Sequence, residues 1–414
     1  VIVLPILIWS GMIGRNASDT ESSPITVMSE LVSLFFLFTY AIINLAAFVE
    51  SLGANPSFRP RFRFFHWGIA AYGTAACVLA AFLIDLELSI VAFLVIFGLY
   101  IWLRYRNLTM AYGDARRGFV YSRIYSLLHQ YARLPLHPKN WRPTIAVLSG
   151  EPEERSMLME YALLFSQRRG IVSLIQIVIS DDPHNIGERR TPRLRRLREL
   201  ARWPLWPVFP TVVIAPEFDS ALRIILQSHS LDPIRPNIVM MGWPRRAERV
   251  VPFFTHLQTI VGDFHRNAIV LANERSSARP QRYDGGTIDI WWQTPEGGSL
   301  MTILAYLVQL DRDWRKSVLR IFLPMNREKV RRIHQVLDAA RIEAEIVGLD
   351  EEVRLRRVLP KYSSGAELVF IEFPDYNTTD VRRQLVTHEL LKRDLAGLPP
   401  CFLVVSNGEA DLLA

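Results

Sequence analysis

The sequence has few groups for metal or nucleophile chemistry. It contains two cysteines and nine histidines in 414 residues. His388-Glu389 lacks the second histidine that a zinc-binding helix needs. No G-x-S-x-G, P-loop or G-x-G-x-x-G motif occurs. We therefore expect a protein that is not an enzyme and that has no metal site and no cofactor.

The scarcity of cysteine also bears on the cell compartment. Cys77 lies in an apolar run and Cys401 in a late strand-like run, so we expect no bridge between them and a reduced, cytosolic setting for the larger part of the chain. The formal net charge is +7. The arginines flank apolar runs or gather in one helix, and no aromatic series accompanies them. We therefore expect no nucleic-acid partner.

Charge is absent from three long apolar stretches, all of them before Arg104. They are Leu31–Val49, Trp67–Ile84 and the shorter Leu88–Leu103. A membrane-spanning helix needs about 20 apolar residues. We therefore predict three transmembrane helices within residues 13–105, at about 24–50, 65–84 and 88–104. The alternative, a buried helical hairpin of a soluble protein, does not explain the charges at the ends of these stretches.

Those flanking charges predict an orientation. Arginines lie between the first and second stretches and directly after the third, whereas acidic residues lie between the second and third: Arg59, Arg61, Arg63, Arg104, Arg106, Asp85 and Glu87. By the positive-inside rule, everything after Arg104 is cytosolic, in a multi-pass protein of the cell membrane. The run Val1–Trp9 is too short to cross a bilayer. We interpret residues 1–12 as the stump of a further helix, and the chain as a fragment.

The remainder of the chain has the rhythm of a soluble α/β protein. Residues 106–137 form an amphipathic linker helix that ends in a proline-rich breaker. Short β-rich runs then alternate with helical ones, which predicts doubly wound, mainly parallel sheets in two lobes, 138–274 and 285–414. The predicted strands are Thr144–Leu148, Ile171–Ile179, Thr211–Ile214, Asn237–Met241, Ala268–Leu271, Thr287–Trp291, Val318–Leu323, Ala344–Val347, Leu368–Ile371 and Cys401–Val405. The predicted helices are Glu153–Gln167, Pro192–Trp203, Ser220–Ser228, Arg246–Val261, Ser299–Asp311, Arg327–Ala340 and Asp380–Asp394.

Three motifs in this part allow two interpretations each. Ser149-Gly150 and Gly297-Gly298 stand where doubly wound sheets bind phosphates, but a structural turn or helix start explains them too, and acidic residues follow Gly150. Seven arginines lie between Arg189 and Arg202. They form either a solvated helix face or, through Arg195, Arg196 and Arg198, a contact with anionic lipid headgroups.

Several strings, taken in order, resemble one family closely. Singly they are unspecific, but their order and spacing along nearly the whole chain resemble the cation-chloride cotransporters, or solute carrier family 12. The strings are Ser33–Asn44, Ser51-Leu52, Asn55-Pro56, Phe58–Pro60, Lys139–Pro143, Val147–Gly150, Ile288–Trp292, Gly297–Leu300 and Leu398–Pro400.

The resemblance implies that this chain is the C-terminal part of a prokaryotic member of the family. It would hold the last helices of an amino acid/polyamine/organocation-type transporter fold and a regulatory domain similar to universal stress proteins. Members are electroneutral symporters of chloride with potassium, sodium or both, and work as homodimers. The broken helices that hold the ions in this family would lie before Val1, so we expect no transport by the fragment alone.

The resemblance also assigns one ion contact. Tyr40 lies near the middle of Leu31–Val49, where a phenol needs a hydrogen-bond partner. A neighbouring helix could supply that partner. The matching tyrosine of the family donates its hydroxyl to a bound chloride, and Asn44, one turn on, would lie on the same face. The resemblance therefore predicts that Tyr40 binds chloride.

Two other functions stay open on the sequence. The first is a membrane-anchored nucleotide or stress sensor without transport activity. The second is a relative of the amino-acid permeases, which the long α/β part disfavours. Further Gly-interrupted apolar spans upstream of Val1 would favour the symporter over the sensor.

Overall fold

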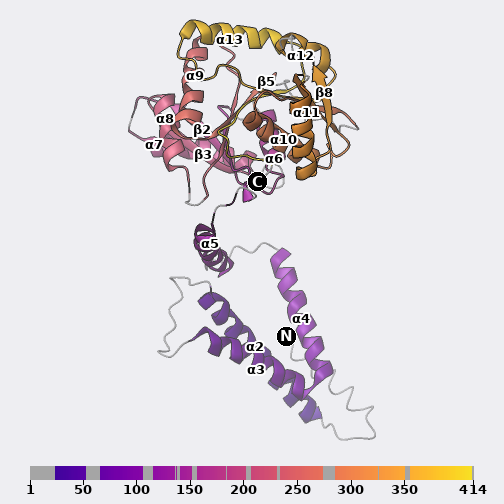
Figure 1. Cartoon of the computed structure of the whole chain (residues 1–414). Coiled ribbons are helices and arrows are strands. Elements are labelled where there is room, and N and C mark those ends of the chain that lie inside the picture. Colours follow the sequence, from indigo (N-terminus) through magenta and orange to yellow (C-terminus); the bar gives the residue numbers. More distant parts are fainter. Residues whose placement is uncertain are drawn as a thin grey trace. The chain divides into compact units, whose positions relative to one another are not determined.

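The computed structural model describes residues 24–52, 66–105, 115–135, 137, 140–151, 156–182, 184–201, 207–230, 234–273, 285–324, 326–349 and 355–412. The chain divides into two compact units, Val1–Leu134 and Pro135–Ala414. Helices and strands are named as they are labelled in Figure 1. Each unit is described by itself.

The first unit is helical. Its helices are α2 (Pro24–Leu52), α3 (Trp67–Ile84), α4 (Leu86–Tyr105) and α5 (Ala115–Arg133). By length and composition, Met28–Leu52, Trp67–Ile84 and Leu86–Leu103 can cross a membrane. These are the three stretches that the sequence predicts. The predicted linker helix, 106–137, corresponds to α5, and residues 1–12 and 53–65 lie outside the described residues.

Polar groups fix the turn between α3 and α4. The Asp85 carboxylate accepts a hydrogen bond from the Leu88 amide at 2.9 Å and so caps α4. The buried Ser89 hydroxyl donates to the Ala81 carbonyl oxygen at 2.7 Å, back across the turn. The two helices therefore meet at a tight turn, and this turn carries the acidic residues Asp85 and Glu87.

The second unit is built on one ten-stranded sheet. The strand order is β3-β2-β1-β4-β5-β10-β9-β6-β7-β8. The strands are β1 (Ile145–Leu148), β2 (Val172–Ile179), β3 (Phe209–Ala215), β4 (Ile238–Gly242), β5 (Asn267–Ala272), β6 (Thr287–Trp291), β7 (Val318–Pro324), β8 (Glu345–Leu349), β9 (Leu368–Glu372) and β10 (Cys401–Val405). All ten predicted strands are confirmed, with ends that shift by two residues at most.

The two halves of the sheet meet through a single antiparallel pair. β10 runs antiparallel to β5 and parallel to β9, with Leu403 opposite Val270. All other neighbours pair in parallel. The sequence predicted two lobes with parallel sheets, and the structure instead joins them edge to edge in one sheet.

Helices cover both faces of the sheet. They are α6 (Ser156–Phe165), α7 (Ile186–Leu200), α8 (Phe218–Ser228), α9 (Val250–Gln258), α10 (Pro295–Gln309), α11 (Arg327–Ala340), α12 (Leu355–Ser363) and α13 (Val381–Asp394), with short turns at Ala247–Arg249 and Thr259–Asp263. Within β1, Ile145 and Val147 belong to the core that α6, α7, α10 and α11 cover, whereas Ala146 and Leu148 belong to the core under α8, α9, α12 and α13. The alternation of a pleated strand thus creates two apolar cores.

A polar cluster is buried between β6, β7 and α12. Asp289 is fully buried, and its two carboxylate oxygens accept hydrogen bonds from Nε and a terminal nitrogen of Arg320, both at 2.8 Å. The buried Ser363 hydroxyl donates to the same carboxylate at 2.6 Å and accepts from the Trp291 indole at 3.1 Å. This network attaches the end of α12 to the sheet.

Candidate functional site

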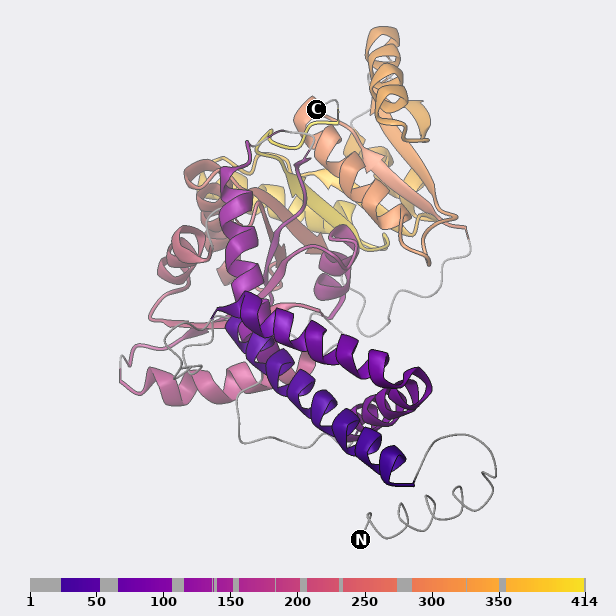
Figure 2. The same ribbon diagram turned by 90° about the horizontal axis from the view of Figure 1, so that it is seen from below.

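The candidate ion contact, Tyr40, lies on α2, which packs closely against α3. Figures 1 and 2 show α2 and α3 side by side, and small residues on α3 allow that approach. Gly73 is one of them, because a methyl group there would come within 3.1 Å of the Asn44 side chain. Leu34 and Phe38 form the buried side of α2, against Ala81.

Tyr40 points away from that buried side. Its side chain is 55% exposed, whereas Ala41, about 100° further round the helix, is buried. Asn44, one turn on, lies about 40° further round α2, on the side toward α3. Its amide lies against Gly73 and donates to the Tyr40 carbonyl oxygen at 2.9 Å. The phenol therefore occupies an open face of α2, and its chloride contact stays a prediction.

The basic helix α7 uses part of its charge internally. Arg189 pairs with Asp182 at 2.7 Å and contacts the Ser180 hydroxyl, and Arg190 donates to the Val212 carbonyl oxygen at 3.0 Å. Val212 belongs to β3, which is an edge strand. Arg190 thus satisfies an edge carbonyl and protects that edge against pairing.

The three predicted lipid-contact residues, Arg195, Arg196 and Arg198, are all exposed on α7. At about 100° per residue they spread over roughly 160° of the helix surface. Glu188 and Glu199 lie within that arc. The three arginines therefore form no narrow basic stripe, which favours the solvated face over the lipid contact.

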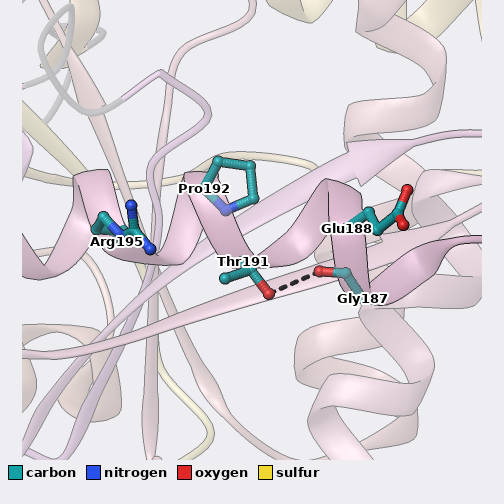
Figure 3. Close-up of a pocket in the computed structure, with 5 residues that line it drawn as sticks. All are labelled: Gly187, Glu188, Thr191, Pro192 and Arg195. Atoms are coloured by element: carbon teal, nitrogen blue, oxygen red, sulfur yellow. Dashed lines mark hydrogen bonds between the residues drawn. The ribbon is translucent and has the colours of Figure 1, made fainter.

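α7 also begins six residues earlier than the predicted Pro192–Trp203, at Ile186. Pro192 lies inside the helix. Thr191 adds a hydrogen bond from its hydroxyl to the Gly187 carbonyl oxygen, at 2.7 Å, as Figure 3 shows. A shallow pocket there is lined by Gly187, Glu188, Thr191, Pro192 and Arg195. Acidic and basic groups both border it, so it favours no ion of either sign.

At the Gly297-Gly298 motif, a carboxylate lies where the sequence allowed a bound phosphate. Thr294 caps α10, and its amide and hydroxyl donate to the Glu372 carboxylate at 3.0 and 2.7 Å. A methyl group at Gly297 would meet the Glu372 carboxyl carbon at 2.8 Å. A negative charge already lies at this helix start, so a phosphate would be repelled.

The corresponding turn of the first half is also structural. Gly150 has φ +62°, which only glycine adopts readily, and a Glu151 carboxylate oxygen accepts a hydrogen bond from Gln176 at 3.2 Å. Both glycine motifs thus match the structural interpretation. Across the described residues no group of three His, Cys, Asp or Glu side chains could hold a metal ion.

Two of the solved structures that resemble this chain illustrate how distant the likeness is in sequence. No family model matches the sequence. One similar solved structure is described as the cytoplasmic domain of a prokaryotic cation chloride cotransporter, with 16% identity, 66% of this chain and 99% of that chain covered, and a TM-score of 0.47. Another is described as a "Putative Universal Stress Protein from Pseudomonas aeruginosa", with 11% identity, 64% of this chain and 94% of that chain covered, and a TM-score of 0.36. Both scores are below 0.5, so the function of this chain has to be inferred from its own residues.

Proposed function

We propose that the chain is part of a secondary active, electroneutral symporter of chloride with potassium, sodium or both. In this proposal α2, α3 and α4 cross the plasma membrane. The α/β unit lies in the cytoplasm, where it regulates transport and holds two copies together. The observation that carries the proposal is the ordered series of cotransporter-like strings, Ser33–Asn44 first and Leu398–Pro400 last, which spans both units of one chain.

The structure supports this combination. Three helices have the length and composition of membrane spans. Most large apolar side chains of α4 are exposed, among them Phe93, Leu94, Phe97 and Trp102, so α4 needs lipid or further helices around it. The Gly297-Gly298 motif gives no support to the sensor without transport, because Glu372 lies where a phosphate would bind there.

Tyr40 is the residue through which the proposal can be tested. A neutral donor stabilises a bound anion without adding a fixed charge, so the anion can leave again in each cycle. The open face of α2 can receive an ion and the helices that enclose it. Loss of the hydroxyl should therefore weaken chloride binding and leave the packing of α2 against α3 intact.

The test is tracer cation uptake by the full-length protein against a chloride series. Tyr40→Phe should raise the half-saturating chloride concentration about tenfold, the worth of one hydrogen bond to a charged group. Tyr72→Phe on α3 is a matched control, since Tyr72 is also exposed in its helix. Cation uptake by the unmodified protein that does not change with the chloride concentration would refute the symporter. An unchanged chloride dependence in Tyr40→Phe alone would remove only Tyr40 from the site.

A further inference from the structure

Three arginines lie within three residues of the starts of three neighbouring strands of the sheet. Arg142 precedes β1, Arg235 precedes β4 and Arg266 precedes β5. These strands lie side by side in the order β1-β4-β5 and run in parallel. Neighbouring strands are about 4.8 Å apart. The fold therefore gathers three positive residues at the amino ends of adjacent strands, on the edge opposite to the carboxyl ends of the strands.

Two of these arginines share a short motif. Arg142-Pro143-Thr144-Ile145 and Arg235-Pro236-Asn237-Ile238 have the same pattern. Ile145 pairs with Ile238, so the two arginines have the same register. Proline restricts the preceding residue to extended backbone. Both arginines thus approach their strands in a similar, constrained way.

An asparagine ladder fixes the backbone beside them. The Asn237 side-chain Nδ2 donates to the Arg142 backbone carbonyl oxygen at 2.7 Å. Its Oδ1 accepts a hydrogen bond from the Thr144 backbone N–H at 2.9 Å. The Asn267 side chain donates to the Asn237 carbonyl oxygen at 3.1 Å. Side chains that cross from strand to strand in this way hold the strand starts rigidly, which is what a preorganised site needs.

The charges of this cluster are poorly compensated. Arg142 and Arg235 are exposed and Arg266 is half-buried. Within the described residues, none of the three guanidinium groups forms an ion pair or hydrogen bond. Burial lowers the pKa of Arg266, the charge of Arg235 lowers it further, and Glu409 partly opposes both. An anion bound at this edge would offset the repulsion between the positive charges of Arg235 and Arg266.

We propose that Arg142, Arg235 and Arg266 form a binding site for a phosphate group. Guanidinium forks match phosphate oxygens in geometry and charge, and several of them on one group give directed, charge-assisted hydrogen bonds. The open edge admits a phosphate carried by a larger molecule as well as a free one. Glu409 is the internal competitor, because it is the one acidic residue that acts on Arg266 from the C-terminal segment.

The test is calorimetric titration of the full chain in detergent micelles, at low salt. The probes are inorganic phosphate, short-chain phosphatidic acid and, as a control, short-chain phosphatidylcholine, whose phosphate is covered by choline. We expect the double variant Arg235→Gln/Arg266→Gln to bind phosphate at least about tenfold more weakly. Glu409→Gln should bind it more tightly. The matched control Arg331→Gln/Arg332→Gln changes two exposed arginines of α11 and should bind as the unmodified chain does.

The probes also separate two sources of the phosphate. Similar affinity for inorganic phosphate and phosphatidic acid supports a free phosphate ligand, and a clear preference for phosphatidic acid supports a lipid headgroup. Binding of neither probe overturns the proposal. So does binding that is unchanged both in the double arginine variant and in Glu409→Gln, since the second variant changes a side chain near the edge and leaves the strands intact.

Discussion

The buried carboxylate of Asp289 offers a sharp test of how the second unit is held together. Asp289→Asn keeps the shape of the side chain but removes its charge. The carboxylate accepts three hydrogen bonds, two from Arg320 and one from Ser363. The amide group of asparagine would turn a donor toward at least one of these donors. The Arg320 side chain is 24% exposed, so it would lose its ionic partner in a largely dry setting and keep only the Tyr362 carbonyl oxygen among these acceptors.

Breaking a buried pair costs roughly 3–5 kcal/mol, and the partial exposure of Arg320 places the expected loss at the lower end, about 3 kcal/mol. The assay is urea unfolding of the full chain in a mild detergent, followed by tryptophan fluorescence, since Trp291 is part of the network. Asp338→Asn, on the exposed side of α11, is the control and should change the free energy of unfolding by less than about 0.5 kcal/mol. A loss below about 1 kcal/mol in Asp289→Asn would show that the network does not anchor α12.

Three further predictions concern charge and assembly. If Arg195, Arg196 and Arg198 contact lipid, their replacement by Gln should weaken binding to anionic vesicles below about 0.1 M salt. Unchanged binding would show that these arginines form only a solvated face of α7. The isolated segment Pro138–Ala414 should form a dimer by light scattering at micromolar concentration, and a strict monomer would count against the proposed assembly. Burial lowers the pKa of His256 to about 4, against the weaker opposing effect of Asp219. The folded state therefore binds the proton less readily than the unfolded one, and stability falls as pH drops from 6.5 toward 4, by up to about 3 kcal/mol. His256→Gln should flatten that pH dependence in the same urea assay, and an equally steep loss in the variant would contradict the assignment.

The strands were predictable because each is a short apolar run with its own local signal. Cys401–Val405 and Thr287–Trp291 have the predicted bounds. The partner of a strand has no such signal. β10 pairs with β5, from the other half of the unit, and nothing in either apolar run indicates the antiparallel direction. The strand pattern therefore predicts two lobes but cannot show that the β5–β10 pair joins their strands in one sheet.

Prolines account for two differences among the helices. Pro192 favoured a helix start at that residue, since proline is common in the first turn, but α7 begins at Ile186 and continues through Pro192. α12 was not predicted, because Pro360 and a run of charges obscure its apolar side. Packing decides such helices, and only the sheet beneath them shows where an apolar side chain can be buried.

The candidate sites also depend on contacts between residues that are distant in the sequence. Arg142, Arg235 and Arg266 are far apart in sequence, and only the strand order brings them to one edge. Glu372 reaches Thr294 across 78 residues, so the sequence left the phosphate interpretation of Gly297-Gly298 open. Sequence patterns located the elements, and tertiary contacts decided what each motif does.

The family-like strings differ in what they can report about function. In the α/β unit, a methyl group on Gly298 would lie 2.2 Å from the ring of Trp292, and Trp292 is buried beneath α10. Ile288–Trp292 and Gly297–Leu300 therefore belong together for a steric reason that any protein with this packing would share. Tyr40 is different, because its exposed phenol fills no space between α2 and α3. The chloride dependence of Tyr40→Phe therefore tests the proposed ion contact, which a variant of the glycine pair cannot do.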